Sequence, residues 1–214
     1  MKSALARKFK EIKASLHPWP PELSPAVRPP FYLQEGFLAN ADILWSQFAQ
    51  KMADAVELND GLTMLLFAFR RDAYEFLTAA AERIFSQEAL NEFTDALRAW
   101  GKETIGSVHV TMPQVRVYVE GCQRNLLCDS TEAGWHYMVS LTRNEARDAG
   151  RIKLVSESVS GPRNGAAGLA SLVNLQLRFN QLLVHDTRRA YQIISPRTGK
   201  DPCAGLVFLD GYMW

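Results

Sequence analysis

From residue 105 onward the chain is a succession of short segments in which apolar and polar residues alternate. Valines at 108, 110, 115, 117 and 119 recur with a period of two and are β-branched, which is typical of strands. The same signal recurs in residues 135–142, 151–159, 182–184, 191–194 and 206–209. Glycines between these segments mark turns. So many short strands after a helical first half indicate an α+β protein with a barrel or sandwich core.

The first half carries a different pattern. Phe31-Tyr-Leu reads as a short strand, and Asn40-Ala-Asp42 is a helix start that is followed by apolar residues at helical spacing. Residues 70–100 are predicted to be helical, with a break at Ser86. The predicted apolar faces consist of Tyr74, Leu77, Ala81, Ile84 and Phe85 before the break, and of Leu90, Phe93, Leu97 and Trp100 after it. Such faces would pack two helices on one side of a sheet.

Composition limits the class of protein. The chain has 214 residues, 47% of them apolar, which is enough for a sizeable core. We expect one domain, residues 1–214, with a mainly helical part at 1–104, a proline-rich connector at 17–30 and a β-barrel part at 105–214. With 24 basic and 23 acidic residues, the net charge of +1 argues against nucleic-acid binding driven by charge. We predict no membrane span, and three cysteines without a pairing pattern favour free thiols and a cytoplasmic location.

Several segments, in their order and spacing, resemble the 2-oxoglutarate/Fe(II)-dependent oxygenase superfamily, in its prolyl-4-hydroxylase-like form. The resemblance covers roughly residues 30–214 and implies a double-stranded β-helix (jelly-roll) with supporting N-terminal helices. The segments that carry it are Phe31-Tyr-Leu-Gln-Glu-Gly-Phe37-Leu38, Val115-Arg-Val-Tyr-Val-Glu-Gly121, Asn125-Leu-Leu127-Cys-Asp129-Ser, Trp135-His-Tyr-Met-Val-Ser-Leu-Thr142, Gly150-Arg-Ile-Lys-Leu, Asn180-Gln-Leu-Leu-Val-His185-Asp-Thr-Arg-Arg-Ala-Tyr191, and Asp201-Pro-Cys-Ala-Gly205 continuing to Trp214.

The resemblance also locates the expected chemistry. These oxygenases bind iron(II) with two histidines and one carboxylate. The matching positions in this chain are Leu127, Asp129 and Tyr191, so that only the carboxylate is retained. The cation that binds 2-oxoglutarate would stand at Leu206, which carries no charge. Arg197 could replace it by reaching inward, and Arg189 could bind an acidic ligand at the barrel mouth.

A second set of metal ligands is an alternative to this one. His136 and His185, together with Asp129 or Asp186, would form a cupin-like metal site. Because successive strand residues point to opposite faces, His185 and Asp186 cannot both face the barrel interior. The alternative for His136 is a strand histidine with a single hydrogen bond.

Two functions follow as hypotheses. The first is a 2-oxoglutarate/Fe(II) oxygenase-like enzyme with a divergent site, which would use Asp129 and Tyr191 on a small molecule such as an amino-acid-like or natural-product intermediate. The second is a metal-free relative that uses the barrel for non-redox catalysis or as a binding module. Iron(II) and 2-oxoglutarate are expected cofactors only for the first. A homo-oligomer stays open, Tyr212 and Trp214 are expected to pack on the helices, and residues 161–168 are expected to form a loop over the barrel mouth.

Overall fold

The computed structural model places the helices and strands of this chain and describes most of the chain from residue 29 onward. The described residues are 29–57, 68–70, 74–119, 123–124, 134–143, 150–157, 169–188, 191–194, 203 and 205–214. The predictions for residues 1–28, which include most of the proline-rich connector, and for the loop at 161–168 lie outside these ranges.

The described residues form two long helices, one short 3-10 turn and eleven strands. The helices are α2 (Ala41–Glu57) and α4 (Gln87–Thr104), with the 3-10 turn at Ala81–Arg83. The strands are β1 (Phe31–Gln34), β2 (Ala68–Arg70), β3 (Tyr74–Ala80), β4 (Gln114–Tyr118), β5 (Gln123–Arg124), β6 (Trp135–Ser140), β7 (Ile152–Glu157), β8 (Leu169–Leu175), β9 (Leu182–Asp186), β10 (Tyr191–Ile194) and β11 (Leu206–Met213).

The strands pair in the antiparallel order β1-β9-β6-β11-β4-β3-β5-β10-β7-β8, with β2 beside β3. Strand β3 links two parts of this arrangement, because its end pairs with β4 while its start pairs with β5. We call the part that contains β1, β9, β6, β11, β4 and β3 the major sheet. The part that contains β5, β10, β7 and β8 we call the minor sheet. Pairing of strands distant in sequence, such as β4 with β11, is what a jelly-roll requires.

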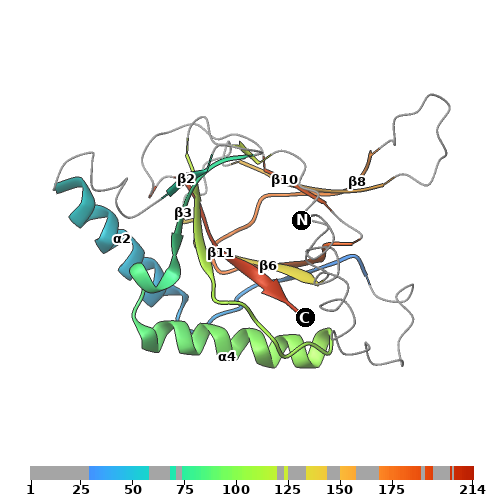
Figure 1. Ribbon diagram of the computed structural model, residues 1–214, viewed down its shortest axis with the longest axis horizontal. Helices are drawn as coiled ribbons and strands as arrows, with labels where there is room; N and C mark the ends of the chain where they lie inside the picture. The colour runs from blue at the N-terminus through green and yellow to red at the C-terminus, as the bar shows by residue number, and fades with distance from the viewer. Residues whose placement is uncertain are drawn as a thin grey trace, which may run out of the picture.

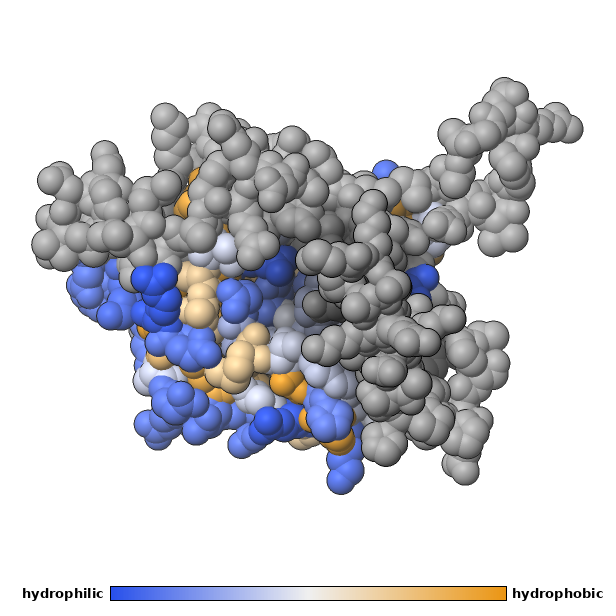
Figure 2. Space-filling model, viewed as in Figure 1, coloured by the Kyte–Doolittle hydropathy of each residue, from blue (hydrophilic) through white to orange (hydrophobic). Residues whose placement is uncertain are grey.

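The outer face of the major sheet is covered by the two helices. In Figure 1, α4 runs along the side of β6 and β11 that is opposite to β8 and β10. Leu44 and Phe48 of α2 and Phe93 of α4 are fully buried in one core with Val139 of β6 and other outward-facing strand residues. The helix sides turned to solvent are mainly hydrophilic, as the lower left of Figure 2 shows. Burial of these apolar faces is the main force that fixes the helices on the sheet.

A second apolar cluster lies on the opposite, inner face of the major sheet. It joins strands of the major sheet to Ile152 and Leu154 of β7, which belongs to the minor sheet. The major-sheet members are Tyr118, Met138, Leu183, Leu206 and Phe208, each no more than 2% exposed. This inner cluster fills the space between the two sheets and leaves the adjoining part of the inner face for other side chains.

The structure confirms the α+β jelly-roll and most of the predicted strands. It also confirms the break at Ser86, since this residue caps α4. The prediction of a helix from residue 70 is wrong, because Tyr74–Ala80 is strand β3 and is paired with β2, β4 and β5. Helical spacing of its apolar residues was outweighed by hydrogen bonds to strands that lie far away in sequence. Strands β2, β5 and β8 were not predicted.

Candidate functional site

A polar cluster lies on the inner face of the major sheet, next to the inner apolar cluster. It consists of Arg116, His136, His185, Asp210 and Tyr212. Its members come from four strands that lie side by side, namely β9, β6, β11 and β4. Strand register brings them together: His136 stands opposite both His185 and Tyr212, and Asp210 is two residues before Tyr212 on the same face.

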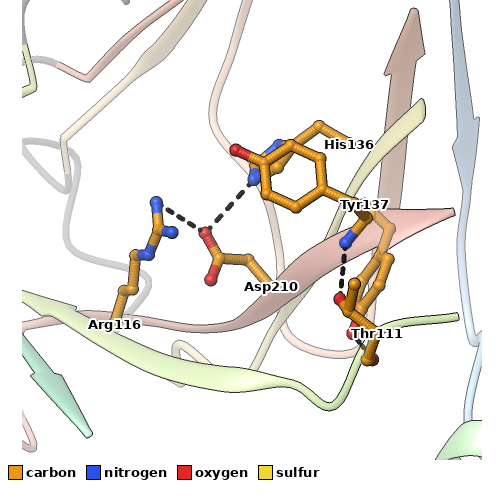
Figure 3. Close-up of polar contacts among 6 residues, drawn as sticks. Thr111, Arg116, His136, Tyr137 and Asp210 are labelled. Carbon is orange, nitrogen blue, oxygen red and sulfur yellow. Dashed lines mark hydrogen bonds and ion pairs between the residues drawn. The ribbon is translucent and has the colours of Figure 1, made fainter. Parts of the chain in front are cut away.

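Asp210 is the centre of this cluster. Its Oδ2 lies 3.0 Å from Nη1 of Arg116 and 3.3 Å from Nε2 of His136. Figure 3 shows the guanidinium and the imidazole approaching the carboxylate from two sides. The ring of His136 lies 5.1 Å from that of His185 and 5.1 Å from that of Tyr212, measured between centroids. One carboxylate therefore links a cation to a group of three rings.

The cluster is shielded from solvent. Side-chain exposure is 0% for Asp210, 2% for His136 and 15% for Arg116. Burial alone lowers the pKa of Arg116, but the negative charge of Asp210, the hydroxyls of Tyr118 and Tyr212 and a hydrogen bond with Tyr118 raise it by more. Arg116 is therefore permanently charged, and its positive charge balances the carboxylate of Asp210.

This geometry defines the proton position on His136. An ionised carboxylate only accepts hydrogen bonds, so Nε2 of His136 must carry a hydrogen to bond with Asp210. A neutral imidazole then has its lone pair on Nδ1. The arrangement has the parts of an acid–base unit: an imidazole, a carboxylate that orients it, and a cation that balances the carboxylate.

The structure brings together two of the predicted site residues, His136 and His185. Tyr191 begins β10, where its backbone pairs with Val155. The carboxylate of Asp186 accepts bonds from Nε and Nη2 of Arg188, both at 2.9 Å, and Asp186 alternates with the inward His185, as expected. Asp129, Arg189 and Arg197 lie outside the described residues, so their roles stay predictions.

Sequence reasoning missed Arg116 and Asp210. Each is a charged residue inside an otherwise apolar strand, and that signal was available in Val115-Arg-Val117 and in Phe208-Leu-Asp210. The expectation that Tyr212 packs on the helices is wrong, because its ring lies against His136 on the inner face. Trp214 is 51% exposed and stacks on His109, so it too differs from the expectation.

The described residues alone do not complete a site for iron(II) and 2-oxoglutarate, and the predicted ligand Asp129 and the side chain of Tyr191 lie outside them. Within the ranges that the structure covers, no group of three or more His, Cys, Asp or Glu side chains is arranged to hold a metal ion. Leu206, at the position where the resemblance requires a cation, is 2% exposed and belongs to the inner apolar cluster. A carboxylate placed against that cluster would lose its hydration without gaining a partner.

No family model and no curated protein matches this chain. Several solved structures match it. A prolyl hydroxylase from Trichoplax adhaerens, solved with a hypoxia-inducible-factor peptide, has a TM-score of 0.57 at 15% identity over 86% of this chain and 83% of its own. A prolyl-4-hydroxylase from Pseudomonas putida has a TM-score of 0.55 at 13% identity, covering 86% and 91%. The non-haem α-ketoglutarate-dependent epimerase of nogalamycin biosynthesis has a TM-score of 0.57 at 12% identity, covering 86% and 76%.

The chain therefore has the double-stranded β-helix fold of the 2-oxoglutarate/Fe(II) oxygenases. At these identities the likeness establishes the fold, and function has to be argued from the site. The described helices include none with the length and apolar character that a membrane crossing needs.

Proposed function

We propose that this protein is a metal-independent relative of the 2-oxoglutarate oxygenases that binds a small acidic molecule at the polar cluster inside the barrel. The proposal rests on one observation, the buried contacts that join Arg116 to Asp210 and Asp210 to His136. A site built for iron would instead direct histidine and carboxylate donors to one point, and here a carboxylate is shared between an imidazole and a guanidinium.

The free-energy cost of burying these charged side chains supports a functional role for them. Removing a carboxylate and a guanidinium from water costs several kcal/mol per ion, and apolar residues of similar size are often as good or better for stability. The neighbouring inner apolar cluster is such a filling, made from the same strands. At the polar cluster the barrel departs from the apolar packing that would stabilise it most, and such departures concentrate at functional sites.

The proposed ligand class follows from the charge of Arg116 and from the position of the inner apolar cluster. Arg116 is the partly exposed cation of the cluster, and a guanidinium favours carboxylate or phosphate partners. The inner apolar cluster occupies the other end of the same face, so a ligand is limited to the polar end. We therefore infer a small molecule with at least one acidic group as the ligand.

The competing function is an iron oxygenase with a rearranged ligand set. It is favoured by the direct cross-strand pairing of His136 with His185 and by the fold of the neighbours. It would need Asp129 to supply the carboxylate, and it predicts that iron(II) and 2-oxoglutarate bind together.

The proposal is tested by binding of small acids to the full chain. We expect a panel of two- to four-carbon carboxylates and their phosphate analogues to contain ligands that raise the melting temperature, because binding to the folded state alone stabilises it. Arg116→Met should abolish this rise, and the control Arg188→Met, which lies at the end of β9 and bonds to Asp186, should keep it. A ligand whose effect is equal in both variants would contradict the proposal.

A further inference from the structure

We propose that the outer edge of β8 pairs with β8 of a second copy of this chain, so that two minor sheets form one continuous sheet across a two-fold axis. Among the strands that the structure describes, β8 pairs with β7 alone and ends the strand order. It lies on the side of the molecule opposite to α2 (Figure 1). The N–H and C=O groups along its outer edge therefore pair with no described strand, and such an edge is a template for another chain.

The sequence of β8 lacks the features that usually prevent pairing at a sheet edge. Over its seven residues it has no charged residue, no proline and no glycine. The other described edge strands are shorter and protected: β1 has four residues between Pro30 and Glu35, and β2 has three residues and ends at Arg70. Short length, proline and charge are the usual means of blocking an edge. Of the described edges, β8 is thus the one that is built to accept a strand.

The apolar side chains of β8 extend the inner apolar cluster to this edge. Val173 and Leu175 are partly buried and pack against that cluster, while Leu172 points to the other face and is 36% exposed. An antiparallel copy centred on Val173 places the two Val173 side chains opposite each other, and Leu175 of each copy opposite Ser171 of the other. Such cross-strand pairs stabilise a sheet. The apolar cluster of one copy would thereby continue into that of its partner.

A second copy satisfies this edge better than a charged peptide does. In antiparallel pairing across a two-fold axis, each outward donor of one β8 meets an acceptor of the other, and the assembly closes after two copies. Because β8 carries no charge, the two strands meet without like-charge repulsion, whereas a charged peptide would find no ion-pair partner on it. A contact made by one short strand from each copy is small, so we expect the dimer to form as the protein concentration rises.

Sedimentation velocity of the full chain over a range of concentrations tests the proposal. We expect the mass to rise from 24.1 kDa toward twice that value. Leu172→Lys should abolish the rise, because the two lysines would lie close together across the axis. The matched control is Leu33→Lys, at a 43% exposed leucine of β1, and it should dimerise like wild type. An equal mixture of Leu172→Lys and Leu172→Glu should restore the dimer. A monomer at every concentration, or a dimer that Leu172→Lys leaves intact, would overturn the inference.

Hydrogen exchange of the wild-type chain covers a variant that fails to fold. At high protein concentration the amides of residues 171–175 should exchange more slowly than at low concentration, while those of β1 should not change. Concentration-dependent protection at β1, or none at β8, would contradict the β8 interface. Both measurements are made without a ligand, so their failure leaves the proposed function of the polar cluster standing.

Discussion

Asp210 is the residue on which the polar cluster depends. Replacing it alone leaves the charge of Arg116 buried without its carboxylate, and breaking a buried pair in this way typically costs about 3–5 kcal/mol. We therefore expect Asp210→Asn to lower the free energy of unfolding by that amount. The double variant Arg116→Met/Asp210→Asn should recover most of it, because both charges are then gone. Urea denaturation of the three proteins checks this, and equal stability of wild type and Asp210→Asn would contradict it.

Tyr137 predicts a pH dependence. Burial raises the pKa of its hydroxyl above the ordinary value of 10.0 and the charge of Asp210 raises it further, while a hydrogen bond with the side chain of Thr111 and the charge of Arg116 lower it in part. The hydroxyl also donates to Thr111 O at 3.0 Å. The folded state thus keeps a proton that the unfolded chain releases. The resulting stability is fully present below about pH 10 and is lost as the pH rises toward the folded value. We expect Tyr137→Phe to make the alkaline decline in unfolding free energy less steep, by up to about 1.4 kcal/mol per pH unit.

Asn180 is the one described non-glycine residue with a positive φ, 59°. Its side chain accepts from Leu38 N and donates to Leu38 O, both at 2.8 Å, and so attaches the segment before α2 to the start of β9. Asn180→Gly keeps the backbone conformation but loses both bonds, while Asn180→Ala also adds backbone strain of about 1–2 kcal/mol. Thermal unfolding should give the highest melting temperature for wild type, a lower one for Asn180→Gly and the lowest for Asn180→Ala. Equal melting temperatures of the two variants would show that the φ value is not a constraint.

The sequence predicted the residues of the site only in part. Strand parity predicted that His185 and Asp186 cannot both face the barrel interior, but not which of the two does. Parity could not predict that His136 meets Asp210, because the two are 74 residues apart and join only when β6 pairs with β11. The contact of Asp210 with His136 thus follows from sheet register, which depends on the whole barrel.

At the scale of elements, Ser86 and Gln47 connect the two helices. Ser86 Oγ accepts from Ala89 N of α4 and from Nε2 of Gln47 in α2, while Ser86 N donates to Oε1 of Gln47. We expect Ser86→Ala to cost about 1 kcal/mol. A double-mutant cycle with Gln47→Ala should give a coupling energy of about 0.5 kcal/mol or more. Gln87→Ala, which removes an exposed bond within α4, is the control, and additive effects of Ser86 and Gln47 would contradict the connection.

The elements that sequence predicted well are those whose apolar pattern is local. Helix α4 has its cap at Ser86 and its buried stripe of Leu90, Phe93 and Leu97. Strands β9 and β11 contain the segments predicted at 182–184 and 206–209, and β6 forms most of the one predicted at 135–142. Strand β3 was predicted as helix because Tyr74, Leu77 and Ala81 have helical spacing. Its conformation comes from the partners on both sides, and no pattern within the segment specifies those partners.

At the scale of the whole molecule, the fold and the interior suggest different chemistry. The arrangement of strands is that of the 2-oxoglutarate oxygenases. Leu206, where the resemblance predicted the cation for the co-substrate, is 2% exposed and belongs to the inner apolar cluster. The polar cluster lies on the adjoining part of the same face, and under the proposed function it gives the barrel a different use. A fold can keep its framework while its site changes, because the framework is stabilised by the outer helices and the core rather than by the site.

The most direct test is anaerobic calorimetry of the purified full chain with iron(II) and 2-oxoglutarate, singly and together. We predict no heat of binding for 2-oxoglutarate with or without iron(II), and no joint rise in melting temperature. A metal-dependent rise of several degrees with 2-oxoglutarate would contradict the central claim and would direct the search to an iron site that includes Asp129.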